Sequence, residues 1–369
     1  MQITKIVITG GPCGGKSTAL GKIQREFEQL GYTVLFVPET ATELITGGVA
    51  PWTCGTNCDY QICQLRLQLE KEKIFEKAAR TMNKEKILIV CDRGALDNKA
   101  YMSDSDFDKV LNKINSNEVE LRDSYDAVFH LVTAAKGAED RYTLSNNPAR
   151  IETIEEAKEL DDRIISAWTG HPHLRVIDSS TDFENKLKRL IEEIALFLGE
   201  PEPFEIERKF LIEYPDTNYL NKLPNCQGVE IVQTYLTGPN GEKTRIRKRG
   251  SDGNFVYFQT TKHKISDVKR IEIEKRLSKD EYLELLLDPE TVKHQIKKTR
   301  YCLVYENQYF ELDIYPFWTD KAILEIELRN ENQEIIMPQN LTVIKEVTED
   351  SEYSNSYLAR VYGECLHQN

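Results

Sequence analysis

The residues best suited to chemistry lie near the N-terminus, in the stretch "GGPCGGKST" at positions 10–18. Its spacing is G-x-x-x-x-G-K-S, in which glycines let backbone N–H groups turn inward around phosphate oxygens. An apolar strand-like run precedes the stretch and a helical pattern follows it, so the positive end of the helix adds to the attraction. We expect the lysine to reach the β- and γ-phosphates of a nucleoside triphosphate and the serine to bind Mg²⁺. The predicted nucleotide-binding residues are Gly10, Gly11, Gly14, Gly15, Lys16, Ser17 and Thr18.

Two carboxylates and an arginine follow strand-like runs in the same half of the chain. "VPETA" places Glu39 after one run, and "IVCDRGALD" places Asp92 and Arg93 after another. Carboxylates at the C-terminal ends of parallel strands point into the ligand crevice of the sheet. With Lys16 they form the predicted catalytic set, in which one carboxylate helps to hold Mg²⁺ and the other accepts a proton. Alternatively, either carboxylate only caps a following helix.

The polar segment "EDRYTLSNNPAR" carries Arg141 and Arg150 ahead of the next helical pattern. Arginines on a mobile lid over the γ-phosphate would have this placement. An ordinary exposed loop would have it too, and the sequence leaves both interpretations open. We include both arginines among the candidate nucleotide-binding residues.

A second kind of pattern begins with "EIERKF" at positions 205–210. Read as a strand, it puts Glu205, Glu207 and Lys209 on one face, because strand side chains alternate with period two. Five later stretches repeat the arrangement, each with charges of one sign two residues apart. These are Arg245, Arg247 and Arg249; Glu272 and Glu274; Lys298 and Arg300; Glu311 and Asp313; and Glu325 and Glu327, with Lys262 and Lys345 as further cations.

Rows of one sign are unfavourable when left alone, because like charges on neighbouring sites repel. A solvated edge strand is the ordinary reading of a single charged alternation. Repeated rows of alternating sign instead predict a sheet that curls into a barrel with these faces inward. Such a lumen needs a polyphosphate for the cations and hard divalent ions, Mg²⁺ or Mn²⁺, for the carboxylates.

The elements that must position these residues differ between the two halves. Up to about residue 200, apolar runs alternate with helical patterns, which indicates a parallel sheet covered by helices on both faces. The runs are "KIVIT", "TVLFV", "ILIVC", "AVFHLV" and "LRVID". The last helical pattern ends at Gly199, and "EPEPF" follows as a short stiff connection. Beyond it, short strands and turn signals such as "GPNGEK" and "SDGN" predict a mostly β half. We therefore expect an α/β domain over 1–200 and a β domain over 204–369.

The chain has 369 residues, a formal net charge of −13 and eight scattered cysteines. This charge argues against binding to duplex DNA or to an anionic membrane surface. No apolar run approaches the roughly 18 residues of a membrane span, and "MQITKIVITGG" shows no secretory signal. With cysteines that read as reduced thiols, we expect a cytoplasmic protein of unknown oligomeric state.

The phosphate loop and the "DRG" stretch together resemble P-loop kinases that act on nucleosides, nucleotides or polynucleotide ends, including the small AAA-like kinases of nicotinamide riboside. The resemblance covers most of the first half. It implies ATP as the phosphoryl donor and Mg²⁺ as the cofactor, and it leaves the acceptor open.

The second half resembles the CYTH, or triphosphate tunnel metalloenzyme, superfamily. The resemblance is carried by E-x-E-x-K at 205–209, "RIRKR", "EIEK", "ELDIY", "EIELR" and "VTEDSEYSNSYLA". It implies an eight-stranded antiparallel tunnel. The implied metal ligands are Glu205, Glu207, Asp313, Glu325 and Glu327, with Glu272 and Glu274 as a further acidic pair. The implied phosphate-binding cations are Lys209, Arg245, Arg247, Lys262, Arg300 and Lys345, and Lys262 is also a candidate catalytic residue.

These readings lead to a bifunctional phosphate-handling enzyme, an ATP-dependent kinase joined to a metal-dependent triphosphatase. Its partners would be a nucleoside triphosphate and a triphosphate-bearing small molecule or RNA 5′ end. One alternative is a kinase or ATPase regulated by a tunnel that senses a polyphosphate or nucleotide without turnover. Another is an adenylate cyclase, for which no residue marks an adenine pocket.

Overall fold

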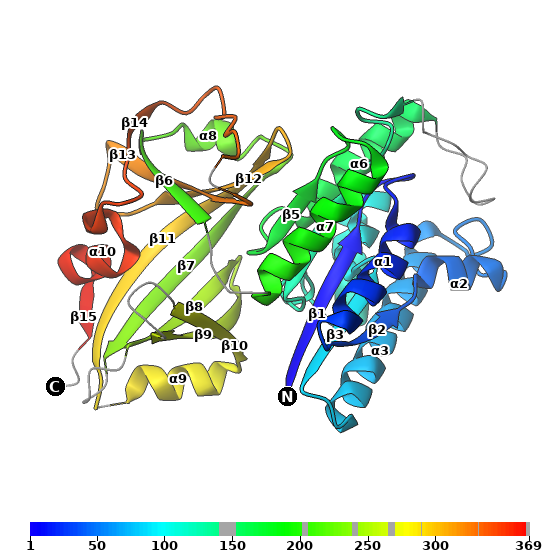
Figure 1. Ribbon diagram of the computed structural model, residues 1–369, viewed down its shortest axis with the longest axis horizontal. Coiled ribbons are helices and arrows are strands. Elements are labelled where there is room, and N and C mark those ends of the chain that lie inside the picture. The colour runs from blue at the N-terminus through cyan, green and yellow to red at the C-terminus, as the bar shows by residue number, and fades with distance from the viewer. Residues whose placement is uncertain are drawn as a thin grey trace. The chain divides into compact units, whose positions relative to one another are not determined.

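The computed structural model describes residues 1–139, 153–200, 206–237, 243–264, 270–288, 290–330 and 332–366 (Figure 1). By its internal contacts the chain divides into two compact units, Met1–Ala195 and Leu196–Asn369.

The first unit is built on a parallel sheet of five strands in the order β2-β3-β1-β4-β5. All of the predicted apolar runs form its strands, so the predicted parallel sheet is confirmed. The inner strands are buried along nearly their whole length, and their apolar runs fit a sheet whose two faces are both covered. The strands are β1 (Gln2–Thr9), β2 (Thr33–Val37), β3 (Lys86–Asp92), β4 (Ala127–Leu131) and β5 (Leu174–Ile177).

Helices connect and cover these strands (Figure 1). Several begin at a side-chain cap, and Thr153 and Glu156 form a capping box at the start of α6. Among the helices that the structure describes, none is both long and apolar enough to cross a membrane. The helices are α1 (Lys16–Gln29), α2 (Thr40–Thr46), α3 (Asn57–Thr81), η1 (Ala95–Tyr101), α4 (Asp104–Ile114), α5 (Glu118–Arg122), α6 (Ile154–Trp168) and α7 (Phe183–Leu198).

The second unit is an antiparallel sheet that runs in the order β10-β9-β8-β7-β11-β12-β13-β6-β14, with β15 also paired to β11. The predicted antiparallel class is confirmed. The sheet has ten strands where eight were predicted. Within the residues that the structure describes, β10 and β14 are the two ends of this path, and no pairing closes it into a barrel.

The strands are β6 (Ile206–Glu213), β7 (Cys226–Thr237), β8 (Lys243–Ser251), β9 (Asn254–Lys264), β10 (Arg270–Leu277), β11 (Val292–Tyr305), β12 (Gln308–Ile314), β13 (Lys321–Leu328), β14 (Val343–Glu346) and β15 (Glu364–Leu366). The helices are α8 (Thr217–Leu220), α9 (Lys279–Leu287), η3 (Ser351–Tyr353) and α10 (Asn355–Tyr362).

The register separates a charged face of this sheet from an apolar one. Glu325 lies opposite Lys209 on β6 and opposite Glu311 on β12, so these charged side chains share a face. The alternate residues form an apolar core that includes Leu324, and this core packs against Leu220 of α8. A second apolar cluster on β7, β8 and β10 packs against residues of α9. The charged rows therefore belong to the face opposite these two helices. Part of that face carries a further apolar cluster, in which Leu211, Ile296 and Ile323 pack with Leu358 and Ala359 of α10.

Local turn chemistry matches the sequence at two places. Asp252 and Gly253 link β8 and β9 with φ of 52° and 80°, the left-handed values that a tight hairpin needs. Helix α7 ends just before Gly199, whose φ is +75°. The predicted turn in "GPNGEK" lies mostly outside the described residues.

Candidate functional site

The phosphate loop joins the end of β1 to the start of α1 and lies against the end of β4. Gly10 has a φ of +137°, and a Cβ atom there would stand 2.0 Å from the carbonyl oxygen of Leu131. Only glycine permits this approach, so the first glycine of the motif places the loop on the sheet. Ser17 and Thr18 lie exposed in the first turn of α1.

Lys16 is buried beneath the loop that precedes it. Its Nζ donates to the carbonyl oxygens of Gly10 at 2.9 Å and Gly11 at 3.3 Å. Burial and the nearby Arg93 guanidinium lower the pKa of Lys16 to about 8. Neutral carbonyls compensate a buried ammonium only partly, so this group is well suited to pair with phosphate oxygens.

Arg93 brings the ends of β2 and β3 together. Its Nε donates to Glu39 at 2.6 Å, and its Nη1 donates to Asp97 at 3.1 Å. Its φ of 72° is left-handed, which is uncommon for a residue other than glycine and is typical of functional turns. Burial alone would raise the pKa of Glu39, but Arg93 and the Thr42 hydroxyl bring it down to about 2. Glu39 makes no capping hydrogen bond to α2, so the helix-cap alternative does not describe its side chain.

Asp92 differs from Glu39, which is paired with Arg93, because no lysine or arginine of the described residues forms an ion pair with Asp92. Burial and the Glu39 carboxylate raise its pKa. Its Oδ1 is buried without a hydrogen-bond partner. A buried carboxylate oxygen in this state, beside a phosphate loop with an exposed serine hydroxyl, fits a hard divalent cation. Ser17 and Asp92 are thus the residues of this unit that suit Mg²⁺.

Asp97 was not among the predicted site residues. It accepts a hydrogen bond from Arg93, one from Thr9 Oγ1 at 2.6 Å and one from Trp168 Nε1 at 2.6 Å. It fixes the guanidinium that in turn holds Glu39. Its only signal in the sequence is its place four residues after Arg93, in "DRGALD".

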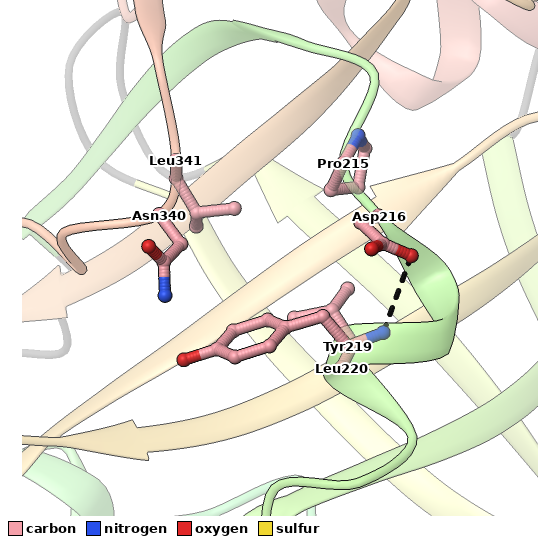
Figure 2. Close-up of a pocket in the computed structure, with 6 residues that line it drawn as sticks. All are labelled: Pro215, Asp216, Tyr219, Leu220, Asn340 and Leu341. Atoms are coloured by element: carbon pink, nitrogen blue, oxygen red, sulfur yellow. Dashed lines mark hydrogen bonds between the residues drawn. The ribbon is translucent and has the colours of Figure 1, made fainter.

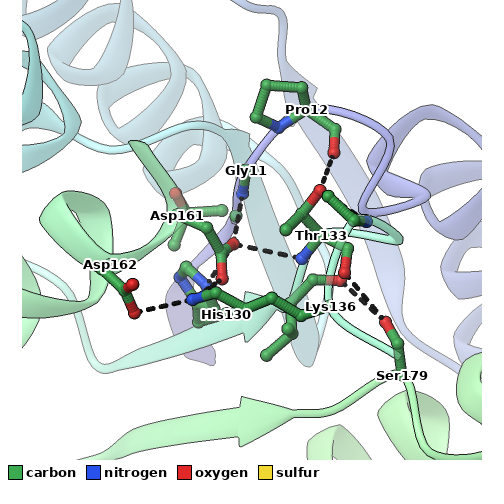
Figure 3. Close-up of polar contacts among 12 residues, drawn as sticks. Gly11, Pro12, His130, Thr133, Lys136, Asp161, Asp162 and Ser179 are labelled. Atoms are coloured by element: carbon green, nitrogen blue, oxygen red, sulfur yellow. Dashed lines mark hydrogen bonds and ion pairs between the residues drawn. The ribbon is translucent and has the colours of Figure 1, made fainter. Parts of the chain in front are cut away.

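Asp161 of α6 was also missed, and it anchors the phosphate loop from the other side (Figure 3). Its Oδ1 accepts from the backbone N–H of Gly11 at 2.9 Å and of Thr133 at 3.1 Å, and it lies 2.9 Å from His130 Nε2. Its Oδ2 accepts from Lys136 at 3.0 Å. Although burial opposes ionisation, His130 and Lys136 hold the pKa of Asp161 well below its usual range. The predicted lid residues Arg141 and Arg150 lie outside the described residues.

In the second unit, Arg300 is surrounded by carboxylates rather than left free. It donates to Asp313 at 2.7 and 2.6 Å and to Glu325 at 2.8 Å, and it also bonds to Glu311. Lys209 forms an ion pair with Glu325 at 2.7 Å. Burial would raise the pKa of Asp313, but Arg300 and Lys298 hold it well below its usual range. Lys298 was not among the predicted site residues, although its row was recognised in the sequence.

The arginine row of β8 meets β9 and β10 on the same charged face. Arg247 donates to Glu274 at 2.9 and 3.1 Å, and Arg245 donates to Thr260 Oγ1 at 3.2 Å. Burial and the crowding of Arg245, Arg249 and Arg300 lower the pKa of Arg247 to about 10, against the pull of Glu274. An anionic ligand on this face would reduce the repulsion between these guanidinium groups.

Glu207 lies directly opposite Glu327 on the neighbouring strand. Burial, followed by the charges of Glu325 and Glu327, raises the pKa of Glu207 to about 7, even though 44% of its side chain is exposed. Like charges placed opposite each other are unfavourable unless a cation compensates them, and Lys209 Nζ lies 3.8 Å from Glu207 Oε1. Carboxylate oxygens are also the ligands that Mg²⁺ and Mn²⁺ prefer, so the chemistry of this acidic pair suits a divalent cation.

Other predicted residues of this face are placed differently or are not described. Lys345 is half-exposed, lies 3.6 Å from Asp350, and stands over the ring of Tyr353. Glu205 and the side chains of Lys262 and Glu272 lie outside the described part of the structure. Among the described residues, no group of three or more His, Cys, Asp or Glu side chains is arranged to hold a metal.

A cavity of about 270 Å³ lies on the second unit, beside α8 (Figure 2). It is lined by Pro215, Asp216, Tyr219, Leu220, Asn340 and Leu341. Asp216 Oδ1 accepts from the N–H of Tyr219 and so caps α8. None of the predicted phosphate-binding or metal-binding residues lines this cavity.

Comparison with known protein families finds a match within the first unit. Residues 5–186 match the family model of the AAA domain. A search of curated proteins found no match. Among solved structures, the inorganic triphosphatase NE1496 is 29% identical, with a TM-score of 0.28, over 42% of this chain and 94% of that one. A deoxyadenosine kinase from M. mycoides with bound dATP is 18% identical, with a TM-score of 0.36, over 52% of this chain and 98% of that one. With its glycine loop between β1 and α1 of a parallel sheet, the N-terminal region of this chain is an AAA-type P-loop domain.

Proposed function

We propose that the chain is a two-domain phosphate-handling enzyme whose first unit transfers the γ-phosphoryl group of ATP to a hydroxyl acceptor. One observation supports this most strongly. Among the described residues, a buried lysine donates to the carbonyls of its own phosphate loop and lies near Asp92, which has a buried carboxylate oxygen without a hydrogen-bond partner there. An ATPase needs only the loop, whereas the Glu39–Arg93–Asp97 arrangement also provides a base and a clamp for an acceptor.

In this reaction the acceptor oxygen forms a bond to the γ-phosphorus, and the bond from that phosphorus to the β,γ-bridging oxygen breaks. ADP leaves, and the hydroxyl proton passes to Glu39. Lys16 and Arg93 stabilise the charge on the transferring group. Glu39 is a weak base with its pKa near 2, but a loose phosphoryl-transfer transition state demands orientation of the hydroxyl more than strong basicity. Mg²⁺, held by Ser17 and Asp92, would neutralise phosphate charge.

The roles of the two carboxylates are separable by substitution. Asp92→Asn would raise the Mg²⁺ concentration needed for half-maximal activity by about tenfold, because a metal ligand is lost. Glu39→Gln would lower kcat by about 10²-fold with the Mg²⁺ requirement unchanged. Steady-state rates over a Mg²⁺ titration measure both effects. If the two variants behaved in the opposite way, the two assignments would have to be exchanged.

We propose that the second unit hydrolyses a triphosphate with the help of Mg²⁺ or Mn²⁺. The supporting observation is the acidic pair of Glu207 and Glu327, which adjoins the cation rows on one face of the sheet. Sensing without turnover would require the cations but not this pair. A water attacks the terminal phosphorus and gives up its proton to solvent, and the bond from that phosphorus to its bridging oxygen breaks. Lys209 and the arginines stabilise the charge on the leaving diphosphate group. All seven cysteines whose side chains are described are free thiols, which supports placing the protein in the cytoplasm.

³¹P NMR of the full chain with ATP or inorganic triphosphate, plus Mg²⁺ or Mn²⁺, tests both proposals. Lys16→Ala and Glu207→Ala/Glu325→Ala variants would be compared with the parent. Triphosphate cleavage that survives the loss of Lys16 but not of the glutamates supports a separate hydrolase. Binding of triphosphate without cleavage would overturn the hydrolase proposal in favour of a sensor.

A further inference from the structure

The turn that carries Arg93 has a backbone conformation that depends on its surroundings. Its φ of 72° lies in the left-handed region, which is unfavourable for a residue with a Cβ atom unless neighbouring contacts hold it. This backbone directs the guanidinium toward Glu39 and Asp97, to which it donates. A relaxed turn would therefore displace the side chain that is proposed to stabilise the transferred phosphoryl group.

Two buried side chains bind the backbone on the C-terminal side of this turn. Gln68 Nε2 of α3 donates to the carbonyl oxygen of Arg93 at 3.3 Å. Two residues further along, the backbone N–H of Ala95 donates to the hydroxyl oxygen of Tyr125 at 2.8 Å. Both side chains are at most 4% exposed, so the loss of either bond would leave a backbone group with little access to water.

Glu72 of α3 binds both of these side chains through one oxygen atom. Its Oε1 accepts from Gln68 Nε2 at 3.2 Å and from the Tyr125 hydroxyl at 2.8 Å. The amide of Gln68 has two N–H groups, one for Glu72 and one for Arg93. The hydroxyl of Tyr125 donates its proton to Glu72 and accepts from Ala95 with a lone pair. The bonds that start at Glu72 therefore end on two backbone groups of the same turn.

Lys5 of β1 supplies the counter-charge of this buried carboxylate. Its Nζ lies 3.2 Å from Glu72 Oε2 and 2.7 Å from Glu76 Oε1. Burial would lower the pKa of Lys5, but Glu72 and Glu76 raise it above its usual value. Burial, followed by the charge of Glu72, raises the pKa of Tyr125 well above its usual range, so the phenol keeps the proton that it donates. Lys5 would still have Glu76 as a partner if Glu72 were replaced.

A different set of bonds holds the guanidinium itself. Asp97 accepts from it and is fixed in turn by Thr9 and Trp168. Gly94, within the turn, lies so close to Trp168 that a Cβ atom would stand 2.4 Å from the indole ring. Glu72 thus acts on the backbone of the turn and Asp97 on its side chain, and substitution can separate the two.

We propose that Glu72 is a positioning residue for phosphoryl transfer, because it fixes the turn that carries Arg93. The inference rests on the proposed kinase function and adds to it a residue on which the placement of Arg93 depends. Donors that are fixed before the reaction stabilise developing charge without a cost of reorganisation. Loss of Glu72 lets the turn relax and the guanidinium lose its direction, while Lys16 keeps its place beneath the phosphate loop.

Four single variants of the full chain test this role. Glu72→Met removes the shared acceptor, and Tyr125→Phe removes one hydroxyl group and leaves Gln68 in place. Glu72→Gln is the conservative variant, because its amide oxygen can still accept from Gln68 and Tyr125. Glu76→Gln is the matched control, because it neutralises the other carboxylate that pairs with Lys5, one turn further along α3.

The first measurement observes the Arg93 Nε–H directly, by ¹⁵N NMR of chain labelled at arginine. Its signal is assigned by its loss in Arg93→Lys, and its exchange with solvent reports how firmly the guanidinium is held. We expect exchange to be about tenfold faster in Glu72→Met and Tyr125→Phe, and close to that of the parent in Glu72→Gln and Glu76→Gln. Unchanged exchange in both Glu72→Met and Tyr125→Phe would overturn the inference, whatever the activity of the protein.

The second measurement is the rate of phosphoryl transfer from Mg²⁺-bound ATP to water and to glycerol as hydroxyl probes, followed by ³¹P NMR. The rate of the first unit is the part that Lys16→Met abolishes. We expect kcat to fall about tenfold in Glu72→Met, with the Kd for ATP in calorimetry within about twofold of the parent.

Combination with Arg93→Met separates positioning from a general loss of stability. If Glu72 acts through Arg93, Glu72→Met should slow the Arg93→Met variant no further. A further tenfold loss in the double variant would overturn the positioning role. A parent without any Lys16-dependent transfer would count against the kinase proposal, and the exchange of the Arg93 Nε–H would still decide whether Glu72 holds the turn.

Discussion

Lys16 and Lys298 are both buried ammonium groups, but their partners differ. The partner of each lysine determines whether that lysine can still bind an anionic ligand. The pKa of each is lowered to about 8, chiefly by burial and then by a nearby arginine. Lys298 is bound to Asp313, a full opposite charge. Within the described part of the chain, Lys16 donates to carbonyl oxygens and forms no ion pair. Lys16 can therefore gain an anionic ligand, whereas Lys298 already has the Asp313 carboxylate as its counter-ion.

ATP affinity should consequently fall as pH rises through the pKa of Lys16. The ammonium form is present below about pH 8 and is lost above it, and bound phosphate would favour that form. We expect ATP to bind about tenfold more weakly at pH 9 than at pH 7. Titration calorimetry at the two pH values measures the ratio. Lys16→Met should bind weakly at both, and a parent protein with equal affinity at pH 7 and pH 9 would contradict the assignment.

At the scale of elements, helix α6 supports the phosphate loop through one carboxylate, that of Asp161. Asp161→Ala would leave the N–H groups of Gly11 and Thr133 without their partner in a dry interior. We expect a loss of about 3 kcal/mol in the free energy of unfolding, because an interior network loses its central member. ATP affinity should fall with it, since the loop loses its anchor.

Asp162, the next residue on the same helix, is the control for this prediction. It is exposed and pairs with Lys136 at 2.6 Å, so Asp162→Ala should change stability by about 0.5 kcal/mol or less. Urea unfolding of both variants gives the comparison. Equal losses at the two positions would show that Asp161 has no special part in holding the loop.

Local patterns predicted most of these elements, because strand period, turn residues and glycine spacing act over a few residues. The five parallel strands and the Asp252–Gly253 turn are found where the sequence placed them. Asp161 could not be found this way, because 150 positions separate it from Gly11 and its own surroundings read as an ordinary helix. Likewise, the alternation in β6, β11, β12 and β13 predicted shared faces but not that Arg300 would bind three carboxylates of two other strands. Pairing order, strand number and partner choice are tertiary properties.

At the scale of the molecule, each unit has its own core and its own phosphate chemistry, so ligands should stabilise them separately. In scanning calorimetry we expect ATP at about one hundred times its Kd to raise one unfolding transition by roughly 5–10 °C. Inorganic triphosphate should raise the other. In Lys16→Met the shift with ATP should be lost and the shift with triphosphate retained.

A single transition that moves with either ligand would argue against this separation. So would a triphosphate-dependent shift that disappears together with Lys16, because both ligands would then use the phosphate loop. Arg247→Met, which alters only the charged face of the second unit, should show the reverse pattern to Lys16→Met.

The charged face of the second unit has one more consequence, which follows from the ion pairs of Arg300, Lys209 and Arg247. The sheet carries its own counter-ions. An incoming anion therefore does not meet bare cations but has to exchange places with carboxylates that already hold them. A bare anion would strand those carboxylates, whereas one that arrives with divalent metal ions supplies them with new partners in the same event. The charged face therefore suits an anion that binds together with its divalent metal ions better than it suits a bare anion.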